Sequence, residues 1–241
     1  MVFARSAAMG FNRYVDRRYD ERNPRTVKRE IPAGILNPTP VLIFVVLNII
    51  AFIITTYFIN DICFYLSPVA MMVVLGYSLT KRFTFLCHMV LGLGLALAPI
   101  GAYLAVTGHF ALFPVLYSFA VLFWVSGFDI FYALQDIEFD KSQNLKSIPV
   151  WLGVKGSLWV SALLHFMASV IILYVGIKIG YGLFYWIGAG IFIALLFYEH
   201  LIVKPSDLSR VNQAFATMNG IASVIFGLFV IAELIFDNLV K

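Results

Sequence analysis

Oxygen-bearing side chains recur at every fourth position near the start of the chain. Asn12, Asp16 and Asp20 follow this spacing, so on a helix they form one polar ridge. Such a ridge suits a hard cation such as Mg²⁺, which binds one or two carboxylates and bridges to the phosphates of a substrate. The spacing therefore favours a site for a phosphorylated substrate, although a solvated loop with balanced charges has the same composition.

A second acidic group stands further along the chain. Asp136 and Asp140 are again four residues apart, and Asp129 precedes them by about two helical turns. Asp129 lies at the edge of an apolar run, where a carboxylate costs up to about 2–3 kcal/mol and tends to mark function. Two such ridges could hold a diphosphate between them through metal ions.

A short polar segment, Tyr77–Thr84, carries charges of the opposite sign. Its Lys81 and Arg82 could neutralise a diphosphate leaving group, Arg as a planar fork and Lys as a point charge. The alternative is that both residues only anchor the chain at the membrane surface. A second basic segment, Lys204–Arg210, has the composition of a loop.

The elements that must position these residues are membrane helices. Of the 241 residues, 61% are hydrophobic and only 12% charged, whereas soluble domains carry about 25% charged residues. Seven apolar runs are long enough, or nearly so, to cross a bilayer at about 17–25 residues each. They are Val41–Phe58, Cys63–Leu79, Phe83–Val106, Phe110–Phe128, Ser157–Ile177, Tyr181–Tyr198 and Ala214–Phe236. The sequence therefore predicts an all-α, polytopic membrane helical bundle that forms a single domain over residues 1–241.

The orientation of the bundle follows from its Lys and Arg residues, which are in excess in cytoplasmic loops. With the N-terminal segment inside, all of them except Lys178 and Lys241 lie on the inner side. Four crossings separate the two acidic groups, so both face the cytoplasm.

Other chemistries have less support. The net charge of +4 comes from residues beside the membrane, which favours contact with anionic lipid over nucleic-acid binding. Cys63 and Cys87 form no ligand-spaced group, and the four histidines are dispersed, so packing is the expectation for all of them.

Three ordered motifs carry a resemblance to the UbiA-type prenyltransferases. Asn12, Asp16 and Asp20, followed by Asn23-Pro24-Arg25-Thr26 and Arg29, resemble the first signature of that family. Tyr77-x-x-x-Lys81-Arg82-x-Thr84 is similar to its basic loop. Asp129-x-x-Tyr132, Asp136-x-x-x-Asp140 and Lys146-Ser147 resemble its second signature.

The resemblance is closest to the 4-hydroxybenzoate polyprenyltransferases and related enzymes of menaquinone pathways. It implies a Mg²⁺-dependent enzyme that transfers a polyprenyl group from its diphosphate to an aromatic acid, in a bacterial or archaeal inner membrane, with its site facing the cytoplasm. The implied partners are these substrates and membrane lipid, without an obligate protein partner. The implied metal ligands are Asp16, Asp20, Asp136 and Asp140, and the implied catalytic residues are Asp129, Asp136, Lys81 and Arg82. The implied substrate-binding residues are Asn12, Arg25, Arg29, Tyr77, Lys81, Arg82, Tyr132 and Lys146.

The chain departs from the family pattern at three points. Arg13 stands where the family usually has Asp, and Asn144 where it usually has Gly. The family has nine helices with the first motif after the second, so one to two N-terminal helices are expected to be missing, through a late start codon or truncation. A membrane transporter, and another UbiA-type enzyme such as haem O synthase, are the alternatives.

Overall fold

The computed structural model describes residues 1–240, and Lys241, expected on the outer side, lies outside the described residues. Over that range the chain is helical, without a β-strand. The helices are α1 (Val2–Arg22), α2 (Pro38–Tyr57), α3 (Asp61–Thr80), α4 (Cys87–Thr107), α5 (Leu112–Ala133), the 3₁₀ turn η1 (Leu134–Asp136), α6 (Ile137–Ser142), α7 (Ile148–Ile179), α8 (Leu183–Ile202), the π-helix η2 (Gln213–Met218) and α9 (Asn219–Val240).

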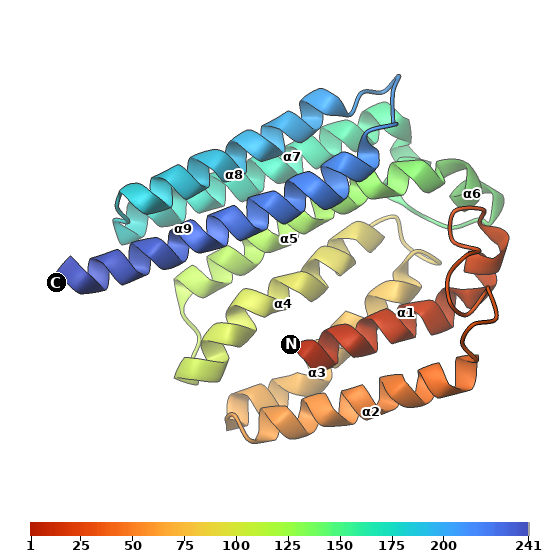
Figure 1. Ribbon diagram of the computed structural model, residues 1–241, viewed down its shortest axis with the longest axis horizontal. Helices are drawn as coiled ribbons and strands as arrows, with labels where there is room; N and C mark the ends of the chain where they lie inside the picture. The colour runs from red at the N-terminus through yellow and green to blue at the C-terminus, as the bar shows by residue number, and fades with distance from the viewer. Residues whose placement is uncertain (241) are drawn as a thin grey trace.

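Seven segments of the described chain are long and apolar enough to cross a bilayer. They correspond to the seven expected runs, so the prediction of an all-α membrane bundle is confirmed. Figure 1 shows the long helices lying side by side in an elongated bundle, with α1 to α3 at one edge and α7 to α9 at the other. The short helix α6 and the end of α1 lie at the same end of this bundle.

Helix α1 carries the first acidic ridge and is held in place by small side chains. Ala7 is fully buried against Val45 of α2 and Met71 of α3. At Gly10, an added Cβ would lie 2.9 Å from a Val45 methyl group, so the two helices approach closely there. The other face of α1 is therefore free to present Asn12, Asp16 and Asp20 to the rest of the bundle.

Helix α5 packs tightly against α4 on one side and α7 on the other. A Cβ at Gly92 of α4 would lie 2.6 Å from the carbonyl oxygen of Leu122, and one at Gly127 of α5 would lie 2.3 Å from the ring of His165. Glycine at these crossings lets the helix backbones come close. This packing brings the last turns of α5, with Asp129, beside the first turn of α4.

The second acidic motif lies where α5 ends. The chain tightens into η1 at Leu134–Asp136 and then forms α6, so Asp136 and Asp140 fall in different short elements. Asn144 follows with φ of 54°, a left-handed conformation that Asn tolerates better than most residues, so it can stand where the family usually has Gly. The next helix, α7, starts at Ile148, earlier than the expected Ser157, and bends at Gly153, where φ is 66°.

Glu233, the single acidic residue within the expected runs, has a structural role at the other end of the bundle. Its carboxylate accepts hydrogen bonds from the backbone N–H groups of Gly182, at 2.6 Å, and Tyr185, at 3.3 Å. These groups belong to the first turn of α8, which has no partner for them within its own helix. Glu233 therefore caps α8 and ties it to α9.

Candidate active site

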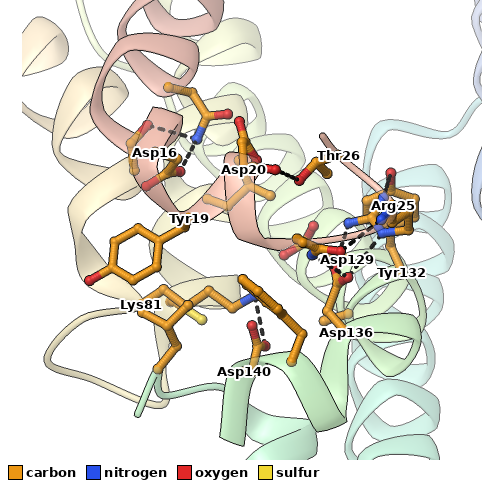
Figure 2. A pocket seen from close by; sticks show the side chains of 18 of the residues that line it. Asp16, Tyr19, Asp20, Arg25, Thr26, Lys81, Asp129, Tyr132, Asp136 and Asp140 are labelled. Carbon is orange, nitrogen blue, oxygen red and sulfur yellow. Dashed lines mark hydrogen bonds and ion pairs between the residues drawn. The ribbon is translucent and has the colours of Figure 1, made fainter. Parts of the chain in front are cut away.

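A pocket of about 320 Å³ opens where α1, the turn after α3, and the α5–α6 segment meet. Residues of all three sequence motifs line it, as Figure 2 shows for the labelled side chains. The expected site residues in the lining are Asn12, Asp16, Asp20, Arg25, Arg29, Tyr77, Lys81, Arg82, Asp129, Tyr132, Asp136 and Asp140. Segments more than a hundred residues apart in sequence thus form one charged site.

The first motif forms the expected ridge on α1. The amide of Asn12 donates to Asp16 at 2.8 Å, and Arg82 donates to the other Asp16 oxygen at 3.1 Å. One turn later, Asp20 is buried and binds Arg29 through both oxygens, at 2.8 and 2.9 Å. The segment after α1 therefore folds back along the ridge and supplies its own cation.

The second motif faces the ridge across the pocket. Asp136 pairs with Arg25, whose Nε donates to it at 2.9 Å, and also accepts from the amide of Asn23 at 3.1 Å. Asp140 pairs with Lys81 at 2.7 Å and has a side chain only 1% exposed. Each of the four expected metal ligands is thus opposite one basic side chain of another segment.

The charges of these cations are stabilised by the pairing. Burial of Lys81 on its own lowers its pKa, but the carboxylates of Asp140 and Asp136 outweigh this and hold that pKa above its usual value. Burial likewise lowers the pKa of Arg25, and its hydrogen bonds and charge interaction with Asp136 raise it overall. Both side chains therefore remain positive and suited to an anionic substrate.

At Asp16, in contrast, the surroundings disfavour the charged form of the side chain. Its pKa lies above the ordinary value because burial disfavours the carboxylate more than the hydrogen bond and charge of Arg82 favour it. A divalent cation beside Asp16 would reverse this balance.

The acidic residues fit a cation shared with a substrate. Within residues 1–240, no group of three His, Cys, Asp or Glu side chains converges on one point. Mg²⁺, however, commonly takes only one or two carboxylates and completes its shell with water and phosphate oxygens. Asp140 also has one buried oxygen, Oδ1, without a hydrogen-bond partner among the described residues. The donor set therefore fits Mg²⁺ held jointly by the pocket and a diphosphate.

An aromatic wall closes one side of the pocket. Tyr132 stacks on Phe215 of η2 with ring centroids 4.2 Å apart, and the guanidinium of Arg25 lies over the Tyr132 ring and donates to its hydroxyl. No motif pointed to Phe215. It reaches the pocket through the π-helix at Gln213–Met218, and π-turns are frequent at functional sites but have no simple spacing signal.

A second residue that sequence reasoning missed is His88. Its Nδ1 lies 2.7 Å from Asp129 Oδ2, and both residues line the pocket. Packing was the expectation for this histidine. One signal in the sequence pointed to the site: His88 lies in the first turn of the helix that follows the Lys81–Arg82 segment.

Lys146, expected to bind substrate, does not line the pocket. Its amine donates to the carbonyl oxygen of Phe83 at 3.2 Å, and its backbone N–H donates to the carbonyl of Lys81 at 2.6 Å. These contacts hold the turn that presents Lys81 and Arg82. A direct role for Lys146 with substrate stays a prediction.

The fold and pocket together define a helical membrane protein with a charged substrate site at one end of its bundle. Residues 1–221 match the UbiA prenyltransferase family, and the chain belongs to this family. It is therefore a prenyltransferase, and not the transporter that composition alone also fitted.

Relatives and solved structures agree with this assignment. A 4-hydroxybenzoate octaprenyltransferase of Tolumonas auensis is 28% identical over 226 residues, which cover 92% of this chain and 77% of the relative. The enzyme of that name from Saccharophagus degradans is 30% identical over 228 residues, covering 94% of this chain and 75% of the relative. An apo structure of a UbiA homologue from Aeropyrum pernix K1 has a TM-score of 0.88 and 29% identity, covering 97% of this chain and 86% of that one.

A more distant structure shares the fold. The UbiA homologue from Archaeoglobus fulgidus, solved with GPP and Mg²⁺ bound, has a TM-score of 0.67 and 19% identity. The match covers 95% of this chain and 83% of that one.

Proposed function

We propose that this chain transfers a polyprenyl group from polyprenyl diphosphate to the ring of an aromatic acid such as 4-hydroxybenzoate, as a step of ubiquinone or menaquinone biosynthesis. The observation that carries the proposal is the meeting of four aspartates and four cationic side chains in one pocket at the end of a membrane bundle. They are Asp16, Asp20, Asp136 and Asp140 with Arg25, Arg29, Lys81 and Arg82. Similarity to 4-hydroxybenzoate octaprenyltransferases supports the choice of acceptor.

The charged residues act on the diphosphate. Asp16, Asp20, Asp136 and Asp140 would hold Mg²⁺, which when bound neutralises the diphosphate as a leaving group. Lys81 and Arg82 contact the diphosphate oxygens and stabilise the charge that develops as the carbon–oxygen bond breaks. These cations are already aligned by their carboxylate partners, so little reorganisation is needed when the substrate arrives.

The remaining residues act on the ring. The ring carbon beside the hydroxyl group of the acceptor attacks the allylic carbon. Asp129 takes the proton that this ring carbon loses. The rings of Tyr132 and Phe215 can shelter the allylic cation through cation–π contacts, and the apolar bundle excludes water that would capture it. Arg25 or Arg29 would bind the acceptor carboxylate through its planar fork.

The site faces the cytoplasm in this proposal. The pocket lies at the end of the bundle where the basic residues gather, and such residues are in excess on the cytoplasmic side of membrane proteins. A cytoplasmic site would receive its soluble aromatic acid directly, while the polyprenyl tail stays in the lipid.

The proposal is tested by giving the purified chain, in detergent or lipid nanodiscs, labelled geranyl diphosphate and Mg²⁺ with one acceptor at a time. The acceptors are 4-hydroxybenzoate and 1,4-dihydroxy-2-naphthoate. The expected result is a prenylated benzoate, identified by mass. Transfer to the naphthoate alone would correct the acceptor, and transfer to neither acceptor would refute the proposed reaction.

A further inference from the structure

His88 and Asp129 form a hydrogen-bonded pair between α4 and α5. His88 Nδ1 lies 2.7 Å from Asp129 Oδ2, and the side chain of His88 is 2% exposed while that of Asp129 is 21% exposed. Ser126 Oγ donates to the backbone carbonyl of His88 at 3.1 Å, which fixes the two helices relative to each other. The pair therefore joins a buried imidazole to a more exposed carboxylate, and both line the pocket.

The surroundings of His88 make its Nδ1 the donor toward Asp129. Its Nε2 is buried and has no hydrogen-bond partner among the described residues. A buried N–H group without an acceptor is rarer and more costly than a buried lone pair without a donor. Of the two neutral tautomers, the one with its proton on Nδ1 therefore fits this site, and a protonated imidazole also donates from Nδ1 to Asp129.

This donor leaves Asp129 with one oxygen for chemistry. Oδ2 is engaged by His88, whereas Oδ1 has no partner among the described hydrogen bonds. A donor fixed at one oxygen restrains the rotation of a carboxylate, so the second oxygen keeps a constant direction in the pocket. Asp129 also lies outside the four ion pairs formed by the expected metal ligands.

We propose that His88 is a positioning residue that orients Asp129 to take the ring proton of the acceptor. The inference rests on the proposed function. The allylic carbon–oxygen bond breaks with its electron pair leaving on the diphosphate, and a ring carbon forms the new bond to the allylic carbon. The electrons of the carbon–hydrogen bond then return to the ring, and its proton passes to Oδ1 of Asp129. Solvent regains that proton on product release.

The test compares two substitutions of His88 in the full chain. His88→Asn keeps a nitrogen donor near the position of Nδ1, whereas His88→Leu removes the donor at similar bulk. General bases contribute about 10²- to 10⁴-fold to rate, so losing the orientation of one should lower kcat by about tenfold or more. We expect that loss in His88→Leu, a much smaller one in His88→Asn, and an unchanged KM for prenyl diphosphate in both.

An isotope effect separates positioning from general damage. With an acceptor deuterated at the ring position that is substituted, the wild-type protein should show little isotope effect if bond ionisation limits the rate. His88→Leu should show a clear primary effect, because removal of the proton becomes slow. A structural defect that only lowers the amount of folded enzyme would leave the isotope effect unchanged. His109→Asn, which changes an exposed histidine of the turn between α4 and α5, serves as the control and should match the wild type.

Several outcomes would overturn the inference. Equal rates for His88→Leu and wild type would do so, as would equal losses in His88→Leu and His88→Asn without an isotope effect. If His88→Leu cannot be purified, His88→Gln replaces it. The amide of Gln lies one carbon further from the backbone, so it does not place a donor at the position of Nδ1. Equal activity of His88→Gln and His88→Asn would then reject the inference. A wild-type protein that transfers no prenyl group would instead refute the proposed function itself.

Discussion

Four of the five aspartates that line the pocket are each paired with a Lys or Arg side chain, and burial explains why. A carboxylate removed from water is costly unless it is paired and hydrogen-bonded. Asp140 is the most deeply buried of the four and depends on Lys81, at 2.7 Å, and on Ser147, at 3.3 Å. The charges that would bind substrate therefore also stabilise the folded chain.

The pair of Lys81 and Asp140 gives the first prediction. Lys81→Met should leave Asp140 as a buried, unpaired charge and lower stability by about 2–3 kcal/mol, less than for a fully buried pair because Lys81 is partly exposed. Adding Asp140→Leu should restore much of that loss, while activity stays absent in both variants. Thermal unfolding in detergent measures this. If Lys81→Met alone were as stable as wild type, the pairing of Lys81 with Asp140 would be contradicted.

Asp16 gives a prediction about pH. Its pKa is raised in the folded chain because burial outweighs the effect of Arg82, so the folded state binds its proton more tightly than the unfolded state does. The stability that this proton contributes is fully present below the unfolded pKa of about 4 and is lost as pH rises through the folded pKa. At neutral pH the ionised Asp16 therefore costs stability.

Asp16→Asn should accordingly raise the unfolding temperature at pH 7 and abolish activity, since the amide is a poor metal ligand. Its advantage should shrink as the pH is lowered toward 4. Unfolding scans of both proteins at the two pH values make the comparison. A constant difference between them would show that protonation of Asp16 is not the cause.

Much of the site could be predicted at the residue scale. The prediction that Asn12, Asp16 and Asp20 form one ridge required only that their segment be helical. His88 and Phe215 could not be found in this way, because their roles depend on which residues they face. Asp129 is 41 positions from His88 in sequence, and no periodicity connects them.

At the scale of elements, α4 and α5 approach each other closely at Gly92. Gly92→Ala would place a Cβ 2.3 Å from Ser126 Oγ and 2.6 Å from the backbone oxygen of Leu122, which cannot move without shifting α5. We expect a loss of about 1–3 kcal/mol in stability and a further fall in activity as His88 moves away from Asp129.

Gly94→Ala is the matched control on the same helix. The nearest atom to its new Cβ is 4.0 Å away, so the variant should be as stable as wild type or slightly more so. Thermal unfolding and the transfer assay should separate the two variants. Similar behaviour of both would mean that close approach at Gly92 does not matter.

The helices themselves were well predicted, and their ends less so. All seven apolar runs form helices, because backbone groups in lipid must be satisfied within each segment. The start of α7 was missed by nine residues, since its first turns contain Gly153, Lys155 and Gly156 and do not look like a membrane span. The π-helix before α9 was not anticipated either.

At the scale of the whole molecule, the central prediction is its orientation. Lys178 is expected outside and Lys204 inside, so cysteines introduced at these positions should react differently with a membrane-impermeant maleimide in intact cells. Lys178→Cys should be labelled, and Lys204→Cys only after the membrane is opened, with Cys63 and Cys87 replaced beforehand. The reverse pattern would place the pocket on the outer face. The additional N-terminal helices expected from the resemblance stay a prediction.

The claim that this pocket joins a prenyl group to an aromatic acid is tested most directly by one comparison of product formation. Purified wild type, Asp140→Asn and Lys178→Gln are given geranyl diphosphate, Mg²⁺ and 4-hydroxybenzoate, and the prenylated acid is quantified by mass. We expect equal product from wild type and Lys178→Gln, because Lys178 lies at the far end of α7, and about a hundredfold less from Asp140→Asn. Absence of product from wild type, or equal product from Asp140→Asn, would contradict it.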